Sequence, residues 1–279
     1  MTATQTPAET EQRGFVQQLT TSMNWRTGLL IPLLAVVTAL IIGIVLIMLT
    51  GSSFGQAMDA YAALLQGSVG SVKAISETLT AATPLILAGL SVAIAFRAGL
   101  FNIGAEGQML VGGMCAVFVG FSITGLPIYV HLPIALLAGF IGGAIWGFIP
   151  GILKAKTGAH EVIVTIMLNY IALRLVDFFL KTELFQREGR NDPVSKTVEA
   201  SAQLTQMLGW MNPALRVHLG LFVALVAAGV IHWLLFRTTT GFEFRAVGAN
   251  PSAARYAGMS ITKVYVLVMM IAGGLAGLA

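Results

Sequence analysis

Charged residues are scarce in this sequence. Only 10% of its 279 residues are Asp, Glu, Lys or Arg, 56% are hydrophobic and the mean hydropathy is +0.84. Soluble domains carry about 25% charged residues, so most of this surface cannot face water. Backbone groups inside a bilayer must be satisfied by helices or closed barrels, and the apolar runs are too long and too continuous for barrel strands. The sequence therefore predicts an all-α fold, a polytopic transmembrane helical bundle.

Cysteine is almost absent as well. A single residue, Cys115, excludes an internal disulfide and a metal cluster built from thiolates. The formal net charge of +4 does not indicate a nucleic-acid partner, because basic residues of a membrane protein usually gather in its cytoplasmic loops. Glycine is abundant by contrast, and 31 glycines suit close packing of helices in a bilayer.

The apolar runs predict about seven spans, since a spanning helix needs about 20 mainly apolar residues. No residue between Gly107 and Leu153 is charged, and this stretch is long enough for two spans, with a break around Pro127 and Pro133. The expected spans are 29–50, 78–96, two within 107–153, 162–180, 217–236 and a last run that reaches Ala279.

Basic residues set the expected orientation. They dominate the short segments on the amino-terminal side of the membrane and are balanced by acids on the other, and an excess of Lys and Arg marks the cytoplasmic side. We therefore expect a cytoplasmic tail at 1–27, a membrane domain at 28–279, an outer loop at 181–215 and a cytoplasmic loop at 237–262. The mixed segment 51–77 is expected on the outer side.

The polar stretch 97–113 is unusual between two apolar runs. If its helix begins near Leu100, Asn102 and Glu106 share one face, with Glu106 about 10 Å along the helix. A buried carboxylate needs a partner, and in a membrane it is a functional-site hypothesis by default. Two interpretations stay open. Either Asn102, Glu106 and Gln108 line the translocation pathway and bind substrate, or Glu106 locks the bundle through another helix.

The span at 162–180 carries further polar residues. Glu161 at its start suits the positive end of the helix dipole, which we favour over contact with substrate. Asn169 lies deeper and is an equal candidate for lining the pathway or for structure. Arg174 and Asp177 have the spacing of an ion pair on one helix. The scattered histidines lack metal-ligand spacing and are interpreted as interfacial: His131, His218 and His232.

The loop at 237–262 contains signals for one short helix. Asn250 is a good N-cap, Pro251 suits the first helical position and Gly258 suits a left-handed helix end. Such a short helix is not stable alone and must pack against something. It either docks into the cleft of a partner or lies as an ordinary capped helix on the membrane surface.

Three segments resemble one known family. GFEFRAVGANPSAARYAGMS (241–260) is similar to the cytoplasmic loop of ABC-importer permeases of the branched-chain amino acid and simple-sugar superfamily. AFRAGLFNIGAEGQMLVGG (95–113) and TGAHEVIVTIMLNYIA (157–172) resemble its nucleoside branch, which is typically paired with a basic-membrane-protein-type binding lipoprotein. The resemblance covers nearly all of 28–279. Family members run longer, so a chain truncated at its carboxyl end is expected.

The resemblance implies a permease subunit of a bacterial plasma-membrane importer for nucleosides or related simple sugars. It implies a second permease subunit, an extracytoplasmic substrate-binding protein and a cytoplasmic ATPase that holds ATP and magnesium, with no cofactor on this chain. The sequence agrees, because no G-x-x-x-x-G-K-[ST] motif is present. The residues implied in coupling to the ATPase are Arg245, Asn250, Pro251, Ala253, Ala254, Arg255, Tyr256 and Gly258.

Other functions stay open at this point. A ribose-type sugar or branched-chain amino acid permease would differ only in its substrate. An ion-coupled secondary transporter would need titrating acids inside the membrane, and Glu106 is the one deep candidate. An intramembrane enzyme would need a nucleophile with a base, or a metal site, and the spans contain neither pattern.

Overall fold

The structure is a computed structural model that describes residues 25–279 except 191, 208, 211 and 213. The expected cytoplasmic tail at 1–27 thus lies almost wholly outside the described residues. The chain divides into two compact units, residues 1–70 and 71–279, and each is described by itself.

The described residues of the first unit form two helices, α2 (Trp25–Leu49) and α3 (Phe54–Val69). Within α2, residues Leu30–Leu49 are long and apolar enough to cross a membrane. The segment 51–77, which is mixed in composition and was expected on the outer side, is mostly helical. Its local signal is a capping box, in which Ser53 Oγ accepts from the Gln56 amide and Gln56 Oε1 accepts from the Ser53 amide at 2.8 Å.

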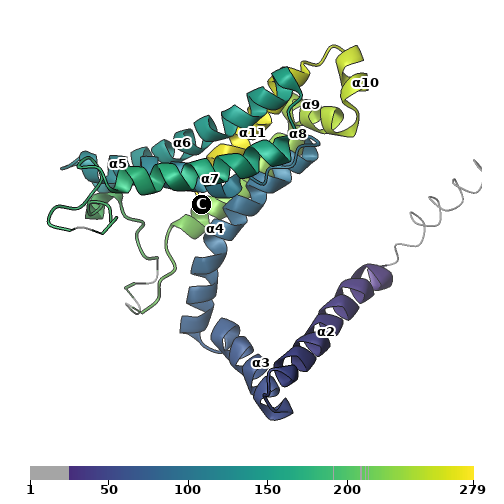
Figure 1. Ribbon diagram of the computed structural model, residues 1–279, viewed down its shortest axis with the longest axis vertical. Coiled ribbons are helices and arrows are strands. Elements are labelled where there is room, and N and C mark those ends of the chain that lie inside the picture. The colour runs from purple at the N-terminus through teal and green to yellow at the C-terminus, as the bar shows by residue number, and fades with distance from the viewer. Residues whose placement is uncertain (1–24, 191, 208, 211, 213) are drawn as a thin grey trace, which may run out of the picture. The chain divides into compact units, whose positions relative to one another are not determined.

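The second unit contains the remaining helices (Figure 1). In chain order they are α4 (Val72–Arg97), α5 (Ala105–Ser122), α6 (Ile128–Thr157), α7 (Glu161–Leu180), the short 3₁₀ helix η1 (Ala200–Ala202), α8 (Gly220–Arg237), α9 (Thr239–Ala249), α10 (Pro251–Tyr256) and α11 (Ile261–Gly277). Counting both units, the described residues contain six helices that meet the length and hydropathy of a span, and α11 is a shorter apolar helix of 17 residues. The polytopic helical bundle predicted from the sequence is confirmed.

Glycines hold α6 and α11 together. Gly143 and Gly147 face Gly273 across the contact, and a Cβ added at Gly143 would overlap the backbone of Gly273. The same stripe continues to Gly139, which faces Gly277. Small residues let two backbones approach closely, and dispersion contacts then stabilise the pair without any hydrophobic driving force from lipid.

A second apolar cluster joins the end of α4 to α8, α9 and α11. Leu100, Leu235, Phe244 and Val268 are all buried within it. This cluster anchors α9 on the membrane-spanning helices. The short helix α10 follows directly after α9, so its position is set by the same core.

The loop at 181–215 lies at the other end of the second unit from α9 and α10 (Figure 1). It is tied back to the helices at two points. Ser76 Oγ of α4 accepts from the Arg216 amide at 2.9 Å, and His131 Nδ1 of α6 lies 2.7 Å from Ser201 Oγ. The sequence analysis interpreted His131 as interfacial, and the structure places it in the first turn of α6, next to this loop. It is fully buried, because the loop folds over the start of α6.

Candidate functional site

The polar stretch between α4 and α5 forms a buried hydrogen-bonded cluster. Asn102 Nδ2 donates to Gln108 Oε1 at 2.9 Å and to Ser91 Oγ at 3.1 Å. Gln108 Nε2 returns a hydrogen bond to Asn102 Oδ1 at 3.1 Å. Asn102 and Gln108 are only 2% and 1% exposed. Each amide therefore satisfies the other, and in this arrangement neither is available to a passing substrate.

The helix that follows starts later than the sequence suggested. α5 begins at Ala105 rather than near Leu100, so Asn102 precedes the helix and does not share a face with Glu106. The reason is local: Asn102 Oδ1 accepts from the Gly104 amide at 3.2 Å, a turn that competes with helix formation. Asn102 points into the protein, whereas Glu106 is exposed.

Glu106 forms neither an ion pair nor a side-chain hydrogen bond with any residue that the structure describes. The expected lock between Glu106 and another helix is thus not seen in this part of the chain. The interpretation that Glu106 lines the pathway stays a prediction. Its position in the first turn of α5 suits a carboxylate, because the amino-terminal end of a helix carries a partial positive charge.

Asn169 of α7 closes the start of α5. Its Oδ1 accepts from the Gly107 amide at 2.9 Å, and its Nδ2 donates to the carbonyl of Ile103 at 3.0 Å. The first amides of a helix have no partner within it, so this side chain satisfies one of them. A Cβ added at Gly107 would lie 2.8 Å from Asn169 Oδ1, which explains why the contact needs glycine. The contacts favour the structural role of Asn169.

Glu161 links α7 to α6. Its Oε2 lies 2.8 Å from Lys154 Nζ, and the side chain is largely buried. Gly158, with φ +70°, makes the left-handed turn that brings the two helices into this position. The predicted place of Glu161 in the first turn of the helix is confirmed, and Lys154 is the partner that the sequence did not reveal.

The expected pair between Arg174 and Asp177 is wrong. Asp177 Oδ2 instead accepts from Lys181 Nζ at 2.7 Å. An acid four residues before a lysine is the favourable order on a helix, and Lys181 sits at the end of α7 where the dipole favours a cation. Arg174 has no ion-pair or hydrogen-bond partner within the described part of the chain.

α10 has the bounds that its caps predicted. Asn250 Oδ1 accepts from the Ala253 amide at 3.0 Å, Pro251 opens the helix and Gly258 follows it with φ +85°. Ala254 is buried in the cluster beneath, whereas Tyr256 is 97% exposed. Arg255 is exposed beside it, as are Ala253 and Gly258. The helix is therefore anchored on one side and open on the other.

Arg245 does not lie on that open side. It belongs to α9, a helix that the sequence analysis missed although Thr238 caps it through the Gly241 amide at 3.0 Å. Its guanidinium carbon lies 5.2 Å from the centroid of the Phe236 ring, and that of Arg97 lies 5.7 Å from the same centroid. Arg245 is half-buried, so its visible role is to hold α9 against α8.

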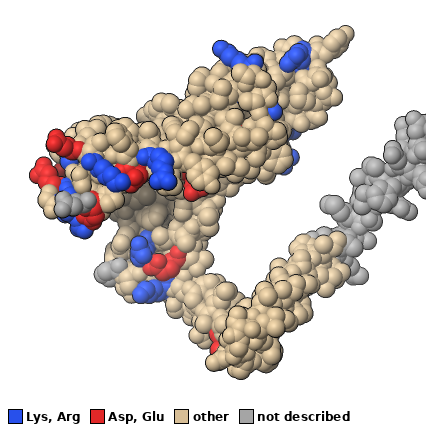
Figure 2. Space-filling model, in the orientation of Figure 1, with Lys and Arg blue, Asp and Glu red and all other residues tan. Residues whose placement is uncertain are grey.

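The two ends of the second unit differ in charge. The α9–α10 end has seven basic residues against three acids, Glu106, Glu161 and Glu243. The other end has six acids and seven basic residues, counting Arg174 of α7. The seven basic residues are Arg97, Lys154, Lys156, Arg237, Arg245, Arg255 and Lys263. Figure 2 shows this on the visible face. Around α9 and α10 only Lys and Arg are seen, whereas basic and acidic residues are mixed at the opposite end.

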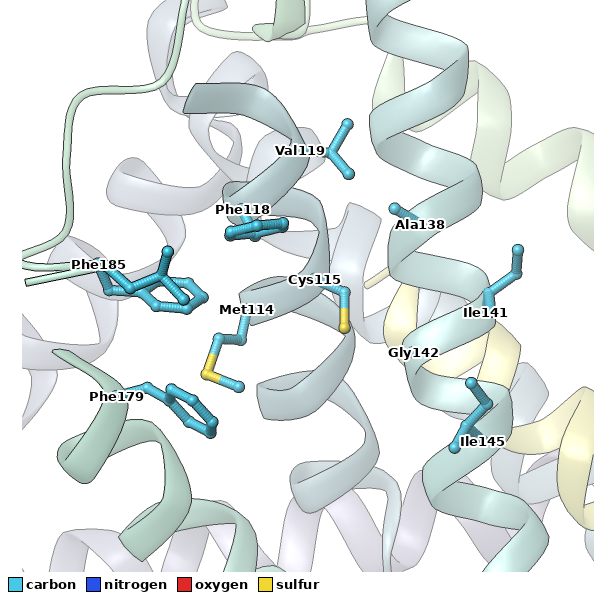
Figure 3. Close-up of a pocket in the computed structure, with 11 residues that line it drawn as sticks. Met114, Cys115, Phe118, Val119, Ala138, Ile141, Gly142, Ile145, Phe179 and Phe185 are labelled. Carbon is cyan, nitrogen blue, oxygen red and sulfur yellow. The ribbon is translucent and has the colours of Figure 1, made fainter. Parts of the chain in front are cut away.

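An apolar groove lies elsewhere in the second unit. It has a volume of about 490 Å³ and is formed by α5, α6 and the end of α7 with the loop that follows (Figure 3). Met114, Cys115, Phe118, Phe179 and Phe185 line one part of it, and the remaining lining residues from α6 are also apolar. No charged or amide side chain reaches it, so the groove does not suit a polar solute.

A family model described as "Branched-chain amino acid transport system / permease component" matches residues 74–279. The chain belongs to this permease family. The family expected from the three sequence segments is thereby confirmed, and with the apolar helices it makes the protein a multi-pass component of a cell membrane and a part of a transport system.

Curated relatives of the permease extend the comparison. A guanosine ABC transporter permease protein of Bacillus subtilis is 45% identical over 90% of this chain and 70% of its own length. A nucleoside ABC transporter permease protein of Lactococcus lactis is 36% identical over 92% and 71%. A glucose ABC transporter permease protein of Haloferax volcanii is 36% identical over 88% and 65%. No solved structure matches the chain significantly.

Proposed function

We propose that this permease forms the translocation pathway of an ATP-driven importer for nucleosides. The substrate class rests on the guanosine and nucleoside permeases to which the chain is similar. The mechanism rests on one structural observation, the capped helix α10, which is anchored through Ala254 and exposes Arg255 and Tyr256.

α10 suits docking on a separate ATPase. A six-residue helix is too short to be stable alone, and here the apolar cluster around Phe244 supports it. Movement of a docked ATPase would therefore pass through α9 to the membrane-spanning helices. In this proposal Asn250, Pro251, Ala253 and Gly258 shape the helix and Arg255 and Tyr256 contact the ATPase.

The ATPase supplies the energy in this proposal. ATP and magnesium bind there, and the permease itself holds no cofactor and hydrolyses nothing, in agreement with the absence of a phosphate-binding loop motif from its sequence. A second permease subunit completes the pathway, and an extracytoplasmic binding protein delivers the substrate.

The charge difference between the two ends supports the orientation. The α9–α10 end is net basic, which is typical of the cytoplasmic side. The loop at 181–215 then faces outward, toward the binding protein. In this proposal the spans alternate, so that the amino terminus lies in the cytoplasm.

Uptake measurements test the proposal. Cells that carry the permease with its neighbouring ATPase and binding-protein genes would be given radiolabelled nucleosides, and each gene would be deleted in turn. We expect nucleoside uptake that disappears without the ATPase. Uptake that persists without the ATPase would contradict it and favour an ion-coupled carrier, for which the exposed Glu106 would be the first candidate.

Glucose or a related simple sugar is the second candidate substrate, because a glucose permease is also 36% identical. The same cells distinguish the two. Competition of labelled nucleoside uptake by unlabelled nucleosides but not by sugars supports the nucleoside assignment, and the reverse pattern contradicts it.

A further inference from the structure

Arg174 is a charged residue within α7 that the bundle leaves unsatisfied. The acid nearest to it in sequence, Asp177, is paired with Lys181. No other described residue forms an ion pair with Arg174, and its side chain is exposed on the surface of the second unit. An unpaired cation inside a span is unfavourable in lipid, so it normally faces a polar pathway or a polar partner.

The position of Arg174 argues against a simple contact with lipid headgroups. It is the fourteenth of the 20 residues of α7 and lies about 9 Å inside the end at Leu180. The Cα–Cβ bonds of a helix tilt toward its amino end. The side chain therefore starts toward the middle of the span and away from the nearer interface, which is opposite to the direction that snorkelling requires.

Two aromatic residues flank Arg174 on the same face. Tyr170 lies four residues before it and Phe178 four residues after it, and they are 68% and 64% exposed. Together with Met167, Ile171 and Leu175, these three residues line a shallow hollow of about 540 Å³. In Figure 1, α7 lies on the viewer's side of the second unit, with no other helix of that unit in front of it.

The hollow combines the aromatic rings of Tyr170 and Phe178 with the planar guanidinium of Arg174, which carries several hydrogen-bond donors. Rings stack on the faces of a nucleobase, and a guanidinium donates two parallel hydrogen bonds to a pair of acceptors. Guanine offers such a pair at O6 and N7, and any 6-oxopurine has the same edge. Adenine has one acceptor, N7, beside a donor, N6, which would oppose the guanidinium. Sugars lack the flat ring that the aromatic residues suit.

We propose that this face of α7, Tyr170, Arg174 and Phe178, lines the translocation pathway and selects 6-oxopurine nucleosides through Arg174. The inference rests on the proposed function, since it names the nucleoside class that the pathway accepts. Arg174 is a specificity-determining residue in it, and the two rings provide stacking surfaces of no particular base preference.

The test uses the complete transporter in cells. Uptake of labelled guanosine, inosine and adenosine would be measured for the wild type, Arg174→Gln and Arg174→Lys, with Arg187→Gln in the exposed loop as a matched control. A bidentate contact to guanine is worth roughly tenfold in discrimination. We expect Arg174→Gln to lower the ratio of guanosine to adenosine uptake about tenfold, Arg174→Lys to lower it less, and Arg187→Gln to leave it unchanged.

The amount of assembled complex is measured in parallel by affinity capture of the ATPase. Tyr170→Leu and Phe178→Leu serve as second variants, because they keep Arg174 and should weaken uptake of all three nucleosides equally. A lowered guanosine-to-adenosine ratio with assembled complex retained supports the proposal.

Three results would overturn it. An unchanged ratio in Arg174→Gln would mean that the guanidinium contacts lipid. An equal loss of all uptake together with loss of assembled complex would mean that it pairs with the second permease. A wild type that transports no nucleoside would overturn the proposed function as well, whereas the first two results leave that function standing.

Discussion

Asn169 of α7 caps the start of α5 by accepting a hydrogen bond from the Gly107 amide at 2.9 Å. The two residues are 62 positions apart in the chain. A side chain that could have lined the pathway is thus used to join two membrane-spanning helices.

Asn169→Leu should therefore destabilise the permease. It leaves the Gly107 amide without its partner, and an unsatisfied buried group costs about 1–3 kcal/mol. The carbonyl of Ile103, which is exposed, can be hydrated instead. The measurement is thermal unfolding of the detergent-solubilised complex. Asn169→Asp keeps the acceptor for Gly107 and loses the donor, so it should fall between the wild type and Asn169→Leu. If Asn169→Leu has normal stability but an altered substrate preference, the structural role is contradicted and Asn169 lines the pathway instead.

Two glycine substitutions should differ sharply. Gly143→Leu places a side chain where α6 meets the backbone of Gly273, and overpacking of this contact should cost several kcal/mol and remove folded protein from the membrane. Gly113 of α5 is exposed and a Cβ added there would meet nothing within 4 Å, so Gly113→Leu should be tolerated. Membrane-fraction yield and size-exclusion profiles of the two variants make the comparison. Equal yields would contradict the close approach of α6 and α11.

Glu106→Gln should change uptake and leave folding intact. Glu106 is exposed and forms no ion pair or side-chain hydrogen bond with a described residue, so its neutralisation breaks no contact that the structure shows. If it lines the pathway, the rate or selectivity of nucleoside uptake changes while the amount of complex stays the same. A fall in the amount of folded complex would mean that Glu106 is buried against another subunit. Normal uptake with a normal amount of complex would exclude both the pathway role and the subunit contact.

Arg255→Glu should uncouple transport. It reverses the charge of the exposed side of α10 while Ala254 remains anchored. We expect substrate-stimulated ATP hydrolysis to be lost while the permease still inserts in the membrane. Lys263→Glu, also exposed at the same end, controls for net charge and should retain most of the stimulation. Stimulation that survives Arg255→Glu would argue against docking through this helix.

The amino-acid sequence by itself determined the features that depend on short stretches of chain. Apolar runs of span length placed the membrane helices, because solubility in lipid is decided segment by segment. The sequence also predicted the two ends of α10 from Asn250 and Gly258, because a helix cap depends on only a few neighbouring residues. A local signal does not always lead to the right prediction. The turn between Asn102 and Gly104 involves only neighbouring residues, yet the sequence analysis started the helix near Leu100.

Only the tertiary structure decided which polar residues are satisfied. Asn102 and Gln108 satisfy each other, Glu161 finds Lys154, Arg245 stacks on Phe236, and Arg174 is left without a partner because Lys181 takes Asp177. Spacing along a helix offers several such pairings of similar strength. Packing selects among them, because burial makes an unpaired polar group costly and an exposed one tolerable.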